Sequence, residues 1–234
     1  MNRITRRELK QDRFAEEVGR TVTFLEQHRK LLLRYGAAAL AVLLIVAGLF
    51  YYNRRQAAAR QEALRAAMDV MDSPIGPSPA PGIVTYATEA DKQAALSKRL
   101  TELTSQYAGS REAAIAQFYM GMEALKEGRQ DAALKYLTAA AESREQDPAS
   151  IAKRALADLY EDQGKTAEAE KMLRSLIEKP TILVPKADAA IALARLLAPS
   201  KPDEARKLLE PLRSEPGAAG RAAIAAYGEL FAGK

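Results

Sequence analysis

The chain has 234 residues, of which 48% are hydrophobic and only 6% aromatic, and it carries a formal net charge of +5. It contains no cysteine, and its single histidine is His28. These absences exclude disulfides, thiolate metal sites, a cysteine nucleophile, a multi-histidine metal site and a histidine-based catalytic triad. We therefore expect a protein that is not an enzyme and has no catalytic, metal or cofactor site.

The positive charge is concentrated at the N-terminus. Residues 1–34 contain nine Lys and Arg against five Asp and Glu, whereas the remaining 200 residues contain 26 against 25. A nearly neutral body argues against a nucleic-acid-binding domain. Alanine and leucine dominate that body and are strong helix formers, so we predict an all-α fold.

Residues 1–34 form the first predicted segment, a basic cytoplasmic tail. Its apolar residues recur at spacings of three to five, which predicts a loosely amphipathic helix. This helix either lies on anionic lipid headgroups or is a solvated helix with ordinary stop-transfer charge. The apolar residues of the stripe are Ile4, Leu9, Phe14, Val18, Val22 and Leu25.

Residues 35–53 predict a transmembrane helix, because no charged residue lies between Arg34 and Arg54. At 1.5 Å per residue this run is roughly 28 Å long, which matches the hydrocarbon core of a bilayer. Tyr51 and Tyr52 stand where an aromatic belt is expected. A buried core helix or a signal peptide cleaved near residues 57–59 are the alternatives. The length of the run argues against the first, and the two arginines before that site argue against the second.

The orientation of the span follows from the tail. The 15 residues on either side of the span contain four basic residues each, so the local charge count is balanced. The tail as a whole is strongly basic, and long C-terminal domains are translocated largely regardless of charge. We therefore place the N-terminus in the cytoplasm and the large domain on the extracytoplasmic side of the inner membrane, which is the periplasm in a Gram-negative cell.

Beyond the span, residues 54–72 lack Pro and Gly and predict a helical extension of the membrane helix. Residues 73–85 form a Pro-rich loop, with four prolines and two glycines in positions 73–82. The remainder, residues 86–234, is the predicted repeat domain.

Three segments of this domain align in register, at residues 111–142, 150–180 and 187–216. The alanines Ala133, Ala169 and Ala205 are spaced by 36 and 36, and a leucine follows each of them four residues later. A small residue recurs upstream, and Gly128 and Gly164 mark the predicted turn between two helices. The leucines are Leu137, Leu173 and Leu209, and the small upstream residues are Gly121, Ala157 and Ala194.

This pattern resembles the tetratricopeptide repeat, in which pairs of antiparallel helices, A and B, stack into a solenoid. The resemblance implies that small residues let helices A and B approach closely, while leucines fill the spaces between pairs. Both ends of the predicted solenoid are expected to be capping helices. Leu96, Leu100 and Leu103 predict a helix B whose partner is the helical extension of the span, and residues 220–234 predict a closing helix with Tyr227 and Phe231.

The order of basic tail, single span, Pro-rich interruption and short repeat domain is similar to the YfgM-type family of membrane-anchored tetratricopeptide-like proteins. Residues 106–137 carry the strongest likeness. The resemblance implies an ancillary subunit of the Sec translocon that contacts newly exported proteins or coordinates envelope complexes. That family has no fixed functional residues that can be transferred position by position.

The A helices of such an array line its concave face, where we expect a groove for a segment of a protein partner. Its predicted residues are Phe118, Met122, Arg154, Asp158, Glu161 and Arg195. For Phe118 and Met122, ordinary core packing is the favoured alternative.

The predicted function is a membrane-anchored scaffold that binds protein partners at the extracytoplasmic face of the inner membrane, associated with the Sec translocon. A chaperone-like holdase for exported proteins and a coordinator of a cell-envelope or division complex are the alternatives. We expect partners among translocon subunits, chaperones or exported clients. We also expect lipid contact through the span and the tail, and no nucleic-acid or small-molecule ligand.

Overall fold

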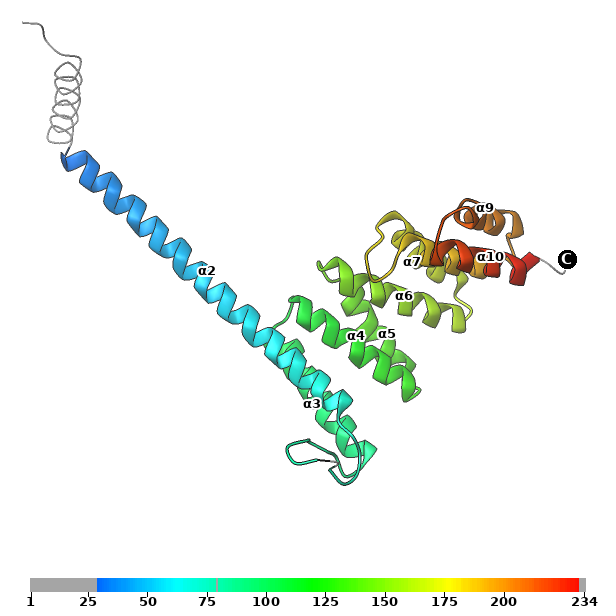
Figure 1. The fold of residues 1–234 in the computed structure, drawn as a ribbon, viewed down its shortest axis with the longest axis horizontal. Coiled ribbons are helices and arrows are strands. Elements are labelled where there is room, and N and C mark those ends of the chain that lie inside the picture. The colour runs from blue at the N-terminus through cyan, green and yellow to red at the C-terminus, as the bar shows by residue number, and fades with distance from the viewer. Residues whose placement is uncertain (1–28, 79, 232–234) are drawn as a thin grey trace, which may run out of the picture. The chain divides into compact units, whose positions relative to one another are not determined.

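The computed structural model describes residues 29–78 and 80–231. These residues form nine α-helices and no strand, which confirms the all-α prediction (Figure 1). The described residues fall into two units that are divided between Ala58 and Ala59. The predicted tail of residues 1–34 lies largely outside the described part of the chain, since only its last six residues belong to a described helix.

Helix α2, Arg29–Asp72, is 44 residues long and contains the predicted span. Its most apolar 18-residue window is not buried at all within the structure, and aliphatic and aromatic side chains between Leu33 and Tyr52 are exposed. The helix is therefore long and apolar enough to cross a membrane. The same helix extends through residues 59–72, where it belongs to the second unit.

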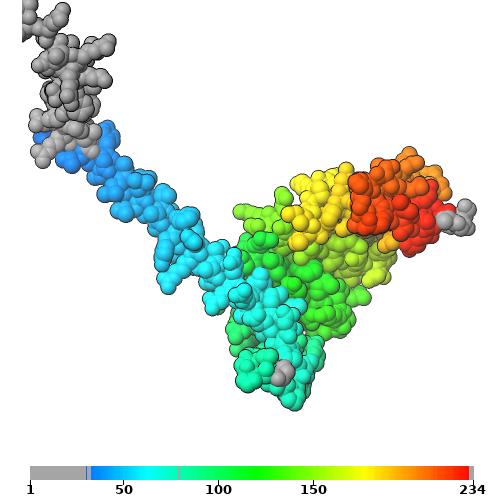
Figure 2. Space-filling model, viewed as in Figure 1, coloured from blue at the N-terminus to red at the C-terminus, as the bar shows by residue number. Residues whose placement is uncertain are grey.

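The second unit is built from helix pairs. After the end of α2 come α3 (Glu89–Gln106), α4 (Arg111–Lys126), α5 (Gln130–Ala141), α6 (Gln146–Asp162), α7 (Thr166–Glu178), α8 (Lys186–Leu197), α9 (Pro202–Arg213) and α10 (Ala218–Phe231). From α3 onward each helix contacts the next, and α4 also contacts α6 while α8 contacts α10. The even-numbered helices thus form the A layer of the array and the odd-numbered helices form the B layer. In the space-filling view, the side chains from α3 to α10 form a continuous packed surface (Figure 2).

The landmark residues of the three sequence repeats form the core, which confirms the helical-hairpin solenoid. Ala133, Ala169 and Ala205 have no exposed surface, and the leucines four residues after them are at most 1% exposed. Gly121 and its counterparts Ala157 and Ala194 are buried as well. Small residues at these points bring helices A and B together, and the leucines fill the remaining space.

The turns within the first two repeats use glycine in the same way. Gly128 has φ +72° and Gly164 has φ +70°, a conformation that residues with a side chain rarely adopt. The amide of Arg129 donates to the carbonyl of Ala124, and the amide of Gly128 donates to that of Leu125. This pattern is a Schellman motif, which ends α4 and turns the chain into α5. The third repeat instead ends α8 at Leu197 and begins α9 at Pro202, where a missing N–H has no cost.

Helix α6 begins earlier than the second sequence repeat. The repeat alignment places its start at residue 150, whereas α6 begins at Gln146 and includes Pro148 in its first turn. Proline is tolerated there because the first amides of a helix have no partner within the helix. Pro148 and Ser150 are buried, so this extra turn contributes to the core.

A helix packs on each end of the array, as the leucines of residues 96–103 and the closing segment of residues 220–234 predict. Leu96, Leu100 and Leu103 of α3 pack against Ala67 and Val70 of α2. Residues 73–88 link these two helices, and an isolated bridge between Ile75 and Tyr86 holds the loop together. At the other end, Arg206 and Arg213 of α9 lie over the rings of Phe231 and Tyr227 of α10, at 4.7 Å and 4.3 Å. Such cation–π contacts fix the closing helix on the last pair.

Candidate functional site

The A layer carries a groove between α6, α8 and α10. Helix α6 contributes Arg154 and Glu161, which lie on one face of the helix because they are seven residues apart. Helix α8 contributes Asp188, Ile191, Ala192 and Arg195, at helical spacings of three, one and three. Helix α10 contributes only short side chains, Ala222 and Ala225. Together these residues line an open cavity of about 520 Å³.

The floor of the groove is apolar and shallow. Ile191 is 7% exposed, and the rest of the floor is formed by the half-buried Ala192 of α8 and the exposed Ala222 and Ala225 of α10. A groove of this kind suits a partner segment that lies along it and presents small or aliphatic side chains to its floor.

The rim of the groove is charged and its carboxylates outnumber its cations. Arg154 forms an ion pair with Asp158 one helical turn further on, and Arg195 forms one with Glu229 of α10 at 2.9 Å. Glu161 and Asp188 form no ion pair with any residue that the structure describes. The two arginines are thus offset by two acids, and two further carboxylates face solvent. The groove therefore favours a partner segment with basic residues.

The structure brings together three of the six residues predicted from the sequence, Arg154, Glu161 and Arg195. Asp158 lies at the rim as the partner of Arg154. Phe118 packs against the buried cluster of α4, α5 and α6 and makes an edge contact with Tyr119, at 5.5 Å between ring centroids. Met122 is half-buried on α4, and neither it nor Phe118 lines this cavity.

Sequence reasoning missed the contributions of Asp188, Ile191 and the alanines of α8 and α10. The position of Ile191 could have been predicted from the repeat alignment. Ile191 precedes Ala194 by three residues, as Arg154 precedes Ala157, so the two residues are equivalent in successive repeats. The positions of Ala222 and Ala225 could not be predicted in this way, because α10 lies outside the three aligned repeats. The groove exists because α10 occupies the place of a further A helix.

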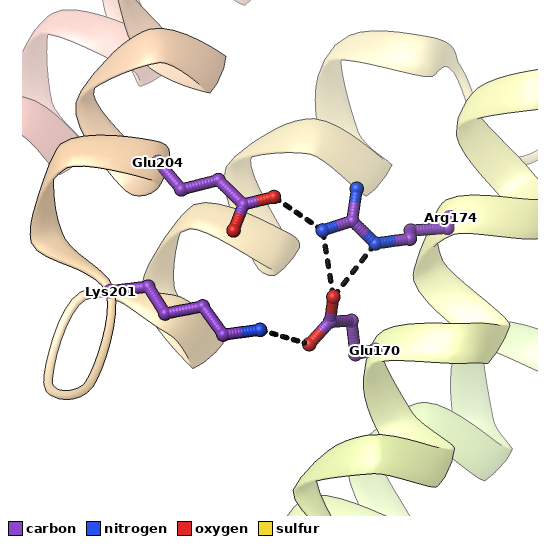
Figure 3. Close-up of polar contacts among 4 residues, drawn as sticks. All are labelled: Glu170, Arg174, Lys201 and Glu204. Carbon is purple, nitrogen blue, oxygen red and sulfur yellow. Dashed lines mark hydrogen bonds and ion pairs between the residues drawn. The ribbon is translucent and has the colours of Figure 1, made fainter.

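A polar network on the B layer joins α7 to the start of α9. Arg174 of α7 donates to Glu170 through Nε at 2.8 Å and also bonds Glu204 of α9 (Figure 3). Lys201, which precedes α9, donates to the other oxygen of Glu170 at 3.1 Å. Hydrogen bonds from Arg174 and Lys201 lower the pKa of Glu170, and those to Glu204 and Glu170 raise the pKa of Arg174. The network ties the second repeat to the third.

A family model described as "Tetratricopeptide repeat-like domain" matches residues 24–181, from the region of the apolar helix through α7. The third helix pair and α10 lie outside the match. No curated protein and no solved structure shows significant similarity to the chain. Domains of this type are typically non-catalytic scaffolds for protein–protein interaction. Because the match covers more than half of the chain, the protein belongs to the tetratricopeptide repeat-like domain family.

Proposed function

We propose that the protein is a single-pass membrane-anchored scaffold whose repeat domain holds a segment of a protein partner in the groove of α6, α8 and α10. The observation that carries this proposal is the groove itself, with an apolar floor and an excess of carboxylates at its rim. Helix α2 would supply the anchor, since its apolar part is long enough to cross a bilayer.

The proposed location is the extracytoplasmic face of the inner membrane, with the N-terminus in the cytoplasm. The basic character of residues 1–34 supports this orientation. The chain has no cysteine, so a single cysteine in place of the exposed Glu210 reports topology cleanly. Labelling of intact cells by a membrane-impermeant maleimide is expected. Labelling that requires disruption of the inner membrane would show that the repeat domain lies in the cytoplasm, which is opposite to the proposed orientation.

The proposed partners are proteins of the Sec translocon or of another envelope complex, as the likeness to the YfgM-type family implies. The partner segment would be basic with small apolar side chains, because such a segment complements Glu161, Asp188 and the alanine floor. A photo-crosslinking residue at Ala192 or Ala225, in cells, tests the proposal. A scaffold predicts one stoichiometric adduct at both positions. A ladder of many different adducts would favour a holdase, and adducts equal to those from Glu210 on the B layer would contradict the groove.

A further inference from the structure

Helix α10 ends with the same five-residue pattern as the A helices of the three repeats. The matching segments are MGMEA at 120–124, LADLY at 156–160, LARLL at 193–197 and YGELF at 227–231. The second residue of each segment is small, so Gly228 is a fourth copy of the landmark formed by Gly121, Ala157 and Ala194. The spacings between these four positions are 36, 37 and 34. Helix α10 is thus the helix A of a fourth repeat.

In the three complete repeats, the small landmark residue of helix A is covered. A Cβ built on Gly121 would lie 2.6 Å from Cγ of Leu137 in helix B, and Ala157 and Ala194 are at most 1% exposed. Gly228, by contrast, is exposed, and a Cβ built on it meets no atom within 4 Å. Within the described part of the chain, α8 and α9 pack against α10 and no helix follows it. The place of its helix B is therefore open.

Two further positions of α10 are uncovered in the same way. Arg221 and Ile224 stand seven and four residues before Gly228, and both are exposed, Ile224 to 55%. The spacings of three and four place all three residues on one face of the helix. We call this face the α10 seat, and none of its residues lines the groove of α6, α8 and α10. The equivalents of Arg221 and Ile224 in the other A helices are buried or half-buried, namely Ala114, Gln117, Ser150, Lys153, Ala187 and Ala190.

The three B helices show which chemistry covers such a seat. Each has an alanine, a leucine four residues later and a further alanine or leucine three residues after that, and all of these side chains are buried. Each also has an acidic residue in its first turn. An amphipathic helix with this pattern therefore complements the α10 seat. The apolar residues are Ala133, Leu137 and Ala140 in α5, Ala169, Leu173 and Leu176 in α7, and Ala205, Leu209 and Leu212 in α9.

Arg221 indicates the direction of the occupant. Its counterpart in the second repeat, Ser150, is hydrogen-bonded at 2.7 Å to Thr181, which follows helix B of that repeat. The end of a helix B thus lies at the start of its helix A. An occupant with the same direction would end beside Arg221, where a cation interacts favourably with the C-terminus of a helix. Arg221 is available for this contact, because it is exposed and has no ion-pair partner among the described residues.

We propose that the α10 seat binds an amphipathic helix of a partner protein, which packs against α10 as the helix B of the fourth repeat. This inference goes beyond the proposed function and depends neither on the groove nor on the membrane anchor. A second copy of the chain is the less suitable occupant, because its B helices are packed in their own repeats and Ala226 and Leu230 of its α10 belong to its core. One helix face is smaller than a standard interface, so we expect a transient contact.

The chain itself supplies a probe with the required pattern. A fluorescein-labelled peptide of residues 165–179, from α7, is titrated with the full-length protein in detergent, and its fluorescence anisotropy is measured. A second peptide with Leu173→Gln and Leu176→Gln keeps good helix formers but loses the apolar contacts. We expect the second peptide to bind about ten-fold more weakly or worse.

Substitution of Gly228 tests whether the peptide occupies the seat. Gly228→Gln places a long side chain where helix B would pack, and α10 tolerates it because the position is open and glutamine is a good helix former. We expect binding about ten-fold weaker or worse, with an unchanged circular dichroism spectrum. Gly228→Ala is the matched control and should bind the peptide as the parent does, because Ala157 and Ala194 accept a helix B at the same position.

A photo-crosslinking residue at Ile224, in cells, identifies the natural occupant. The expected adduct joins position 224 to another protein, at a segment that carries an alanine and, four residues later, a leucine. An adduct with α10 of a second copy would assign the seat to a dimer, and the lack of any intermolecular adduct would leave the seat without an occupant. Equal binding of the peptide by the parent and Gly228→Gln would place the peptide elsewhere on the protein. Equal binding of the two peptides would exclude recognition of the helix B pattern. Each of these four results would overturn the inference.

Discussion

Gly121 of α4 faces Leu137 of α5 so closely that a Cβ at position 121 would lie 2.6 Å from Leu137 Cγ and 3.3 Å from its amide nitrogen. The equivalent helices of the second and third repeats meet through Ala157 and Ala194, which carry that methyl group. Helices α4 and α5 are thus packed more closely at this point than an alanine at position 121 would permit.

Gly121→Ala should therefore destabilise the repeat domain although alanine is the better helix former. Overpacking of a core typically costs about 1–3 kcal/mol, and the gain in helix propensity of about 1 kcal/mol offsets part of it. Urea unfolding of the full chain in detergent, followed by circular dichroism, measures the effect. An unchanged or raised midpoint would show that α4 and α5 can separate freely at this position.

Gly228→Ala is the matched control for that substitution. Gly228 lies within α10, and a Cβ built there meets no atom within 4 Å. Only the helix propensity changes, so we expect stabilisation of about 0.5–1 kcal/mol in the same unfolding experiment. A loss of stability would mean that α10 has a neighbour on that face.

Arg60 and Glu112 couple the last part of α2 to the first A helix of the repeats. The side chain of Glu112 is 12% exposed and that of Arg60 is 31% exposed, so the pair is largely shielded from solvent. Glu112→Leu leaves the Arg60 charge without its partner and should cost about 1–2 kcal/mol, less than the 3–5 kcal/mol of a fully buried pair. The double variant Arg60→Met with Glu112→Leu should recover part of the loss. A double variant that is no more stable than Glu112→Leu would contradict this coupling.

The network of Glu170, Arg174, Lys201 and Glu204 should make stability depend on pH in acid. The folded pKa of Glu170 is lowered from its ordinary value of 4.5, mainly by the hydrogen bond from Arg174. A lowered folded pKa gives a contribution that is fully present above pH 4.5 and is lost as the pH falls through the folded pKa. Glu170→Gln should lower the unfolding midpoint at neutral pH and flatten its decline below pH 4.5. An identical acid decline in variant and parent would exclude this carboxylate as a contributor.

The sequence predicts the core of the repeats well because periodic small and large residues record helix packing directly. Ala133, Leu137 and their counterparts occupy the buried positions that their 36-residue spacing indicates. The start of α6 is harder to predict, since Pro148 is usually a sign of a loop and is accommodated here only by its place in the first turn.

The groove is less predictable because it depends on how three helices face each other rather than on one helix's periodicity. Arg154 and Arg195 stand out as charges between packing positions, and both line the cavity. Ala222 and Ala225 do not stand out, because an exposed alanine on a terminal helix is common. Phe118 belongs to an apolar stripe of its helix, and such a stripe can face either a groove or the core. In the structure Phe118 packs against the core cluster that contains Leu137 and Leu156.

The most direct test of the scaffold proposal is the yield of the crosslinked adduct formed in cells from Ala225 when the groove carboxylates are reversed. Glu161→Lys combined with Asp188→Lys replaces two unpaired carboxylates at the rim by cations. We expect this double variant to reduce the adduct at least ten-fold with an unchanged circular dichroism spectrum, because two repulsive contacts of about 1 kcal/mol each replace two attractive ones. Glu210→Lys, an exposed reversal on the B layer, should leave the yield unchanged. Equal adduct yields from the groove variant and the parent protein would contradict the account.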